Sequence, residues 1–316
     1  MYELNSGFFN SFAVPVQGYL WVGTSVSGLP GDTPAAEIYR NLRHAWTRLS
    51  KAVPAAPEIA TLSGFDTVHV LEKIISHSNR TDNYKHLLRR MQSCQFTWQP
   101  LVDCIVVRGG CRLPKRYRLI IDDDSKVMRE EFMKMLVDQV GAGSVLVMNP
   151  DTGAFCRENP VPSASLAARF GMGQGTAPLP GPVKAQVKNF GRGKVIRLAE
   201  PFDWSSPGAD RFLLFLAETA KVERPVVTVP GVRAFVSKRD GSFFLPVFNE
   251  SSARTVAAAM TLPRLPAGRH RLRRVSNGGA EEGIVGNGGF RLLLTPHELR
   301  VYELIPVDSR QIRPRK

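Results

Sequence analysis

The chain has 316 residues, a formal net charge of +14, 43% hydrophobic residues and 22% charged residues. This composition is that of a globular protein of about two domains, and no run approaches the roughly 18 apolar residues of a membrane span. The first twenty residues carry no basic leader before their apolar residues, so we expect a cytoplasmic protein without membrane association.

The basic residues and the cysteines do not indicate an obvious ligand. Lysine and arginine are spread along the chain without a helical stripe or interleaved aromatics, which argues against nucleic-acid binding. The cysteines are Cys94, Cys104, Cys111 and Cys156, with no C-x-x-C pair and no metal-ligand spacing with histidine. We expect reduced thiols and neither metal nor cofactor, although Cys104 and Cys111 could pair in an exported chain.

The N-terminal segment, residues 1–52, looks like an incomplete unit. A strand is predicted over residues 16–22, and a turn over 28–33 leads to a predicted amphipathic helix over 37–49. The apolar stripe of that helix comprises Ile38, Leu42, Ala45, Trp46 and Leu49. Such a segment needs a further surface on which to pack.

Strands and helices alternate through the next part of the chain. Strands are predicted over 58–62, 104–107, 118–121, 144–148 and 193–198, and helices over 84–91, 127–140 and 210–220. Because parallel neighbours need long crossovers, this order predicts an α/β domain with a doubly wound parallel sheet of flavodoxin or Rossmann type. Residues 149–182 are rich in Gly, Pro, Ser and Ala and are expected to form a loop or an inserted arm.

After residue 225 the pattern changes to short β segments separated by turn residues. The predicted strands are 226–229, 232–237, 242–248, 254–261, 268–275, 290–294 and 299–304. About seven strands at this spacing predict a small antiparallel β-sandwich. The fold class expected for the chain is therefore α/β followed by all-β.

Several segments, in this order, resemble one known family. They are PEIATLSGFDTVHVL at 57–71, YRLIIDDDSKVMREEFMKMLVDQVGAGSVLVMNPDTGAF at 117–155, GRGKVIRL at 191–198, KRDGSFFLPVFNES at 238–251 and LTPHELRVYEL at 294–304. Together they resemble the C-terminal half of β-galactosidase-like glycoside hydrolases of the family 42 type. The unit at 117–148 is the most specific part of this resemblance.

The resemblance implies a division of the chain into four parts. Residues 1–52 would be the last strand and helix of a (β/α) barrel, 53–222 a glutamine-amidotransferase-like trimerisation domain, 223–307 the β-sandwich and 308–316 a basic tail. It implies a homo-oligomer such as a trimer, and a carbohydrate substrate only where a complete barrel is present. Trp21, at the mouth of such a barrel, could stack on a sugar, although core packing explains it as well.

The expected activity of this chain alone is none, because retaining glycosidases need two carboxylates about 5 Å apart. In the family these residues lie on barrel strands that would precede Met1. Asn249-Glu250 matches the family's acid/base dipeptide, but it ends a predicted strand, where a turn is the natural interpretation. Asp122, Asp123 and Asp124 could bind a cation, but an acidic turn capping the next helix is the preferred prediction.

The sequence shows neither the motif of a nucleophilic cysteine nor that of a phosphate-binding loop. No cysteine lies on a strand-to-helix elbow, and the glycine-rich stretch 171–175 lacks the flanking residues of a phosphate loop. Two alternatives to a non-catalytic oligomerisation unit stay open. One is a stand-alone carbohydrate-binding or scaffolding protein displaying Phe243, Phe244 or Phe248; the other is a piece of an active retaining glycosidase.

Overall fold

The fold is described from a computed structural model. The described residues are 53–54, 57–64, 67, 78–102, 106–107, 109–110, 113, 117–122, 125–173, 177–179, 183–234, 236–239, 242–251, 253–262, 268–275, 281–286, 289–296 and 298–307. The chain divides into two compact units, one of residues 56–94 and 98–222 and the other of residues 1–55, 95–97 and 223–316. Within the described ranges, no helix has the length and apolar character needed to cross a membrane.

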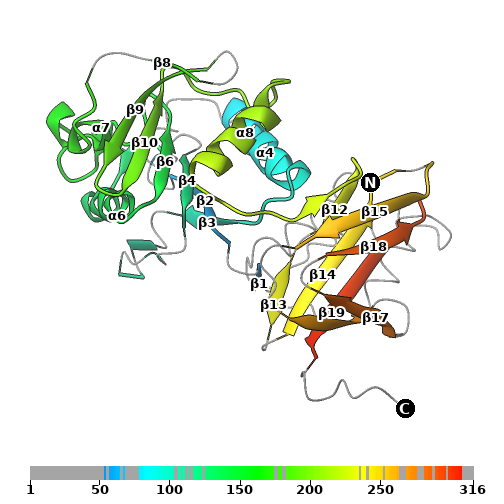
Figure 1. The fold of residues 1–316 in the computed structure, drawn as a ribbon. Helices are drawn as coiled ribbons and strands as arrows, with labels where there is room; N and C mark the ends of the chain where they lie inside the picture. Colours follow the sequence, from blue (N-terminus) through cyan, green and yellow to red (C-terminus); the bar gives the residue numbers. More distant parts are fainter. Residues whose placement is uncertain are drawn as a thin grey trace, which may run out of the picture. The chain divides into compact units, whose positions relative to one another are not determined.

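The first unit is built on a mixed sheet whose strands run in the order β3-β2-β4-β6-β10-β9-β8 (Figure 1). The bounds are β2 Ile59–Ser63, β3 Trp98–Val102, β4 Leu119–Asp122, β6 Val145–Met148, β8 Ala177–Pro178, β9 Lys184–Phe190 and β10 Gly193–Leu198. The first five strands of this order pair in parallel, and β9 and β8 continue the sheet antiparallel. The prediction of an α/β region with a parallel sheet is confirmed.

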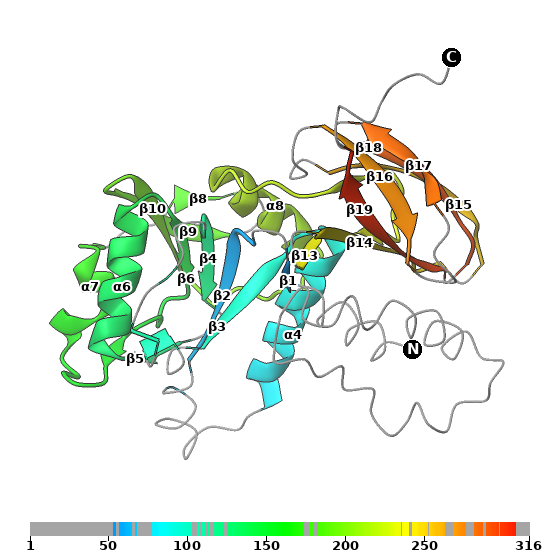
Figure 2. The ribbon, with the colours of Figure 1, turned by 90° about the horizontal axis from the view of Figure 1, so that it is seen from below.

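Helices cover both faces of this sheet. Helix α6 (Glu130–Gly141) lies along one face, while α4 (Ser78–Ser93) and α8 (Ala209–Thr219) lie together on the other (Figures 1 and 2). The core on the α6 side joins the buried face of that helix to the central strands; among its members are Phe132, Leu136, Ile120, Leu146 and Val195. The apolar spacing that predicted α6 and α8 is therefore the spacing of their buried residues.

One predicted strand of this sheet is wrong. The strand expected over 104–107 is replaced by β3 at Trp98–Val102, and the described residues Val106 and Val107 are helical. Pro100 lies inside β3. Because β3 is the edge strand of the sheet, the missing N–H of Pro100 is tolerated there.

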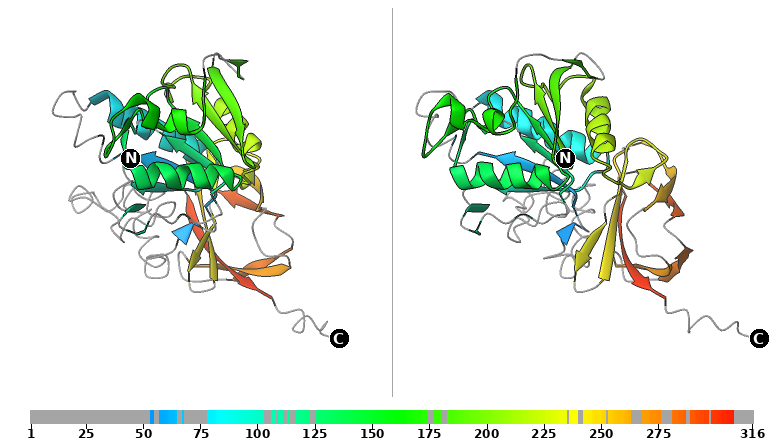
Figure 3. Two further views of the ribbon diagram at one scale, coloured as in Figure 1. Left: turned by 90° about the vertical axis from the view of Figure 1, so that its left-hand side faces the viewer. Right: turned by 60° about the vertical axis from the view of Figure 1, so that its left-hand side comes forward.

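The segment around α6 also differs from the prediction. Val127–Met128 form a short strand, β5, that pairs in parallel with β7 (Phe155–Cys156), so the helix begins at Glu130 rather than at residue 127. The expected loop over 149–182 contains β7, a 3₁₀ turn at Pro162–Ala164, the short helix α7 (Leu166–Arg169) and β8. Figure 3 shows α6 and these short elements from two further sides.

The second unit contains an antiparallel sandwich, as predicted. Its larger sheet runs β1-β13-β14-β19-β16-β17, with β12 paired to β14, and its smaller sheet runs β11-β15-β18. The bounds are β1 Val53–Pro54, β11 Val226–Val227, β12 Val232–Ala234, β13 Ser237–Arg239, β14 Ser242–Asn249, β15 Val256–Thr261, β16 Arg269–Arg274, β17 Glu281–Gly286, β18 Gly289–Leu294 and β19 Leu299–Pro306. Strand β17 was not predicted, because Glu281-Glu282-Gly283 breaks the apolar pattern.

The sandwich core lies between these two sheets. Leu245 and Val247 of β14 pack with Leu272, Tyr302 and Leu304 of the larger sheet, together with residues of the smaller sheet such as Ala258, Met260, Leu292 and Leu294. Gln95 joins this unit through its side chain: its amide donates to the carbonyl of Val232 at 2.9 Å and accepts from the N–H of Ala234 at 2.7 Å. The buried amide thereby provides hydrogen-bond partners for one carbonyl and one N–H of β12.

Candidate functional site

The carboxyl edge of the parallel sheet is the first place to look for a site. Strands β2 and β4 are neighbours, but the chain passes from β2 to β3 on one side before it returns to β4 on the other. Open α/β sheets bind ligands at the carboxyl ends of strands where the strand order reverses in this way. The residues at this position are Gly64, after β2, and Asp122, the last residue of β4.

The carboxylate of Asp122 is already engaged by the protein itself. The N–H of Ser125 donates to both carboxylate oxygens at 3.0 Å, and the hydroxyl of Thr152 donates to Oδ2. Asp122 is only 3% exposed. Nearby, Thr67 accepts from the N–H of Val127 at 2.9 Å and donates to its carbonyl at 3.2 Å. These contacts fix the loops after β2, β4 and β6 to one another.

The described groups are closely packed around Gly64. A Cβ atom placed on Gly64 would lie 2.7 Å from Oγ1 of Thr67 and 3.0 Å from Ser125. The prediction that the acidic turn caps the next helix is wrong for Asp122, because α6 begins at Glu130 and its first N–H donates to Glu158 at 2.8 Å. Asp123 and Asp124 lie outside the described residues.

We expect Asp122→Ala to lower the free energy of unfolding by about 2 kcal/mol, because it leaves the Thr152 hydroxyl and the Ser125 N–H without their acceptor. Urea unfolding followed by circular dichroism measures this effect. Asp151→Ala is the matched control, since its pair with Lys126 is exposed and should change stability by less than about 0.5 kcal/mol. Equal effects of the two substitutions would contradict the structural role of Asp122.

Cys156 lies in a polar cluster that keeps its thiol protonated. Its sulfur is 3.3 Å from Oε2 of Glu130, whose carboxylate is held by Arg169. Burial raises the pKa of Cys156, and the negative charge of Glu130 raises it further. The hydrogen bonds from Arg169 lower the pKa of Glu130. A protonated, buried thiol is a poor nucleophile, so the geometry gives Cys156 a packing role.

The other cysteines add no nucleophile that the structure can describe. Cys94 is 6% exposed, and its sulfur lies 3.8 Å from a carboxylate oxygen of Asp210. Cys104 and Cys111 lie outside the described residues, so the expectation that their thiols are reduced stays a prediction. Within those same ranges, no group of three or more His, Cys, Asp or Glu side chains is placed to hold a metal ion.

Asn249 and Glu250 are both engaged in structural contacts. Asn249 ends β14, is 1% exposed and donates its amide to the carbonyls of Arg254, Leu294 and Thr295. Glu250 pairs with Arg233 at 2.7 Å. The pair therefore fastens the end of the strand, in agreement with the turn expected from the sequence.

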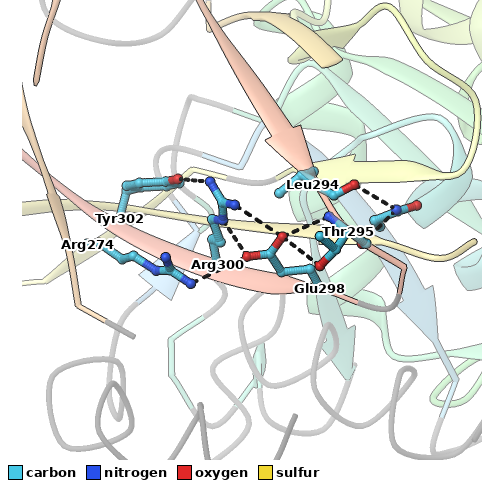
Figure 4. A network of polar contacts seen from close by, with 7 residues as sticks. Arg274, Leu294, Thr295, Glu298, Arg300 and Tyr302 are labelled. Carbon is cyan, nitrogen blue, oxygen red and sulfur yellow. Dashed lines mark hydrogen bonds and ion pairs between the residues drawn. The ribbon is translucent and has the colours of Figure 1, made fainter. Parts of the chain in front are cut away.

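A polar network that the sequence did not predict lies in the sandwich (Figure 4). Glu298 accepts from Nε of Arg300 at 2.6 Å and from the N–H of Thr295 at 2.8 Å, and Arg274 lies 3.4 Å away. Burial would raise the pKa of Glu298, but the hydrogen bonds from Arg300 and Thr295 outweigh it and lower the pKa. Thr295, Glu298 and Arg300 lie within the motif LTPHELRVYEL, whose alternating charged and apolar residues indicated only a strand, whereas Arg274 lies on β16.

The phenylalanines of β14 and the glycine-rich stretch 171–175 do not form a ligand-binding site in the described residues. Phe244 and Phe248 are 3% and 2% exposed, and Phe243 packs against the sandwich core beneath Lys238. They cannot form an exposed sugar-binding platform. Of the glycine-rich stretch, Gly171 has φ +59° and its carbonyl accepts from Lys188, as in a loop. Trp21, which could stack on a sugar or pack in a core, lies outside the described residues.

His270 gives the sandwich a predicted acid sensitivity. It is 2% exposed on β16, and burial lowers its pKa. In the unfolded chain a histidine binds a proton below about pH 6.5, whereas folded His270 resists protonation, so stability should fall as pH drops below that value. Thermal unfolding of His270→Gln between pH 5 and 8 should show a smaller loss than the parent chain. Parallel pH profiles for the two proteins would contradict this role.

Comparison with known proteins identifies the fold. No protein-family model matches the sequence, and no curated protein matches it significantly. Among solved structures, the chain is similar to the GH42 β-galactosidase Gan42B from G. stearothermophilus, with 15% identity and a TM-score of 0.61 over 87% of this chain and 44% of that one.

Two further β-galactosidase structures agree with this match. The β-galactosidase from Bacillus circulans sp. alkalophilus is 14% identical with a TM-score of 0.60, covering 85% of this chain and 44% of its own. The cold-adapted β-galactosidase from Rahnella sp. R3 is 14% identical with a TM-score of 0.59, covering 87% and 45%. The chain thus spans less than half the length of these enzymes, and its fold is that of a part of a GH42 β-galactosidase.

Proposed function

We propose that this chain is the non-catalytic, oligomerisation and structural portion of a β-galactosidase-like glycoside hydrolase of the GH42 type. The observation that carries the proposal is the fold match, which covers 87% of this chain but only 44% of the enzyme Gan42B. The carboxylates considered above support it, because Asp122, Glu250, Glu298 and Glu130 all hold structural partners. Catalysis would then depend on a barrel that the described residues do not include.

Within this proposal, the α/β unit is a doubly wound domain of flavodoxin type that acts as a glutamine-amidotransferase-like trimerisation domain. The strand order supports this assignment, since β3-β2-β4-β6-β10 follows the 2-1-3-4-5 pattern of flavodoxin-like sheets. Its strand-reversal edge is filled by Thr67, Asp122 and Ser125. An edge whose polar groups are occupied by one another in this way is suited to a structural role.

The first experiment measures the molar mass of the purified chain by light scattering and assays the hydrolysis of a chromogenic β-galactoside. A trimer without turnover is the expected result. An inactive monomer would contradict the oligomerisation role and favour a truncated or binding module, whereas measurable turnover would contradict the absence of catalytic residues.

A separate experiment tests the alternative that this chain is one piece of an active retaining glycosidase. If the two catalytic carboxylates lie on a separate or upstream barrel, co-expression of this chain with such a barrel should restore hydrolysis. The same mixture with each barrel glutamate changed to glutamine is the control and should stay inactive. Failure to associate with the barrel would argue for a free-standing scaffold.

A further inference from the structure

Among the described strands, β12 pairs with β14 alone. The register places Val232 opposite Asn249 and Ala234 opposite Val247. The N–H of Asn249 donates to the carbonyl of Glu298 at 3.0 Å, on the β19 side, and so points away from β12. Because the backbone groups of alternate residues face the partner strand in an antiparallel pair, those of Val232 and Ala234 point away from β14.

The side chain of Gln95 takes the place of a neighbouring strand on this side of β12. Its amide nitrogen donates to the carbonyl of Val232 at 2.9 Å, and its amide oxygen accepts from the N–H of Ala234 at 2.7 Å. One residue of a parallel strand beside Arg233 would make the same two hydrogen bonds. A primary amide carries both a donor and an acceptor, so a single side chain is sufficient for this pairing.

The backbone of Gln95 departs from local preference to make this contact. Gln95 has φ +62° and stands two residues after the end of α4, a position that helices commonly give to glycine. Helix α8 ends in the same way, with Lys221 two residues after it at φ +55°. The two differ in their surroundings, because Lys221 is exposed whereas Gln95 is only 6% exposed. The left-handed conformation of Gln95 therefore accompanies a buried side chain whose amide is used.

We propose that the side chain of Gln95 is a strap that keeps β12 in the sandwich, and that β12 opens away from β14 when the amide is removed. Strand β12 has three residues, of which only Arg233 turns its backbone groups toward β14. The strand thus depends on Gln95 for a second pair of hydrogen bonds. Val232 and Ala234 belong to the sandwich core, so opening of the strap exposes apolar side chains while β14, β19 and β16 stay paired.

Hydrogen-exchange mass spectrometry of the full chain tests the strap. Gln95→Met keeps a side chain of similar length on the same backbone, but it has no amide to pair with β12. We expect peptides that cover β12 to exchange at least about tenfold faster than in the parent chain, because two hydrogen bonds are lost. Peptides that cover β15, in the other sheet, should exchange at the parent rate. Unchanged exchange of β12 would overturn the proposal, and so would equal acceleration of β12 and β15.

Glycine substitutions separate the effect of the amide from that of the backbone. Gln95→Gly and Lys221→Gly relieve the same left-handed conformation, but only the first removes an amide from β12. Exchange of β12 should be at least about tenfold faster in Gln95→Gly and unchanged in Lys221→Gly. Equal exchange of β12 in the two variants would overturn the proposal. Each variant is compared with the parent chain, so the outcome does not depend on the oligomeric state proposed above.

Discussion

Replacing Glu298 with glutamine is expected to lower the free energy of unfolding of the sandwich unit by about 3 kcal/mol. The Glu298 side chain is 15% exposed and accepts hydrogen bonds from the side chain of Arg300 and from the N–H and hydroxyl of Thr295. Glutamine keeps the shape, but it removes the charge that balances Arg300 and Arg274 and turns one oxygen into a donor. The two guanidinium groups are then left without their common carboxylate.

The pH dependence of this effect has a definite sign. The pKa of Glu298 is lowered in the folded protein, so its contribution is fully present above the pKa of about 4.3 of an unfolded glutamate and declines as pH falls further. Urea unfolding of the parent and Glu298→Gln should therefore differ most above about pH 5 and converge in acid. Glu200→Gln, at an exposed position, is the control and should change stability by less than about 0.5 kcal/mol.

Gly193→Ala should destabilise the α/β unit by about 3 kcal/mol or prevent its folding. A Cβ atom at this position would lie 2.2 Å from the carbonyl oxygens of Ser144 and Val140. Both oxygens are backbone atoms, so no side-chain rotation relieves the contact. Relief would require β10 to move away from β6, with which it pairs from Lys194 onward.

Gly208→Ala is the matched control for this clash. Nothing lies within 4 Å of a Cβ atom built on Gly208, which precedes α8 with φ −84°. We expect a change of less than about 0.5 kcal/mol in the same unfolding experiment. A stable, normally folded Gly193→Ala protein would show that the close approach of β10 to the α6–β6 turn is wrong.

The parts of the fold that the sequence predicted share one property. Strands β4 and β6 are short, nearly continuous apolar runs, and helix α8 places its apolar residues at helical spacing, so the local sequence alone indicates each element. The errors arise where position in the sheet overrides local pattern. β3 contains Pro100, which is tolerated there because β3 is an edge strand.

The candidate sites show the same limit. The hydrogen bond from the N–H of Ser125 to Asp122 could be predicted from the sequence, because in many turns an acidic side chain accepts from a backbone N–H a few residues later. Its contact with Thr152 was not, since thirty residues and a helix separate the two. The Glu298 network likewise depends on Arg274 of a different strand, which no local pattern connects with Glu298.

The pairing of β1 with β13 affects the order in which the chain can fold. Val53 has to wait for Lys238, roughly 180 residues later, before its strand can join a sheet. At about 5–20 residues per second, the ribosome needs on the order of 10–40 s to supply that partner. The α/β unit, whose elements lie between them, is complete earlier. A nascent chain therefore exposes β1 throughout this interval, which is when a chaperone would have its largest effect on yield.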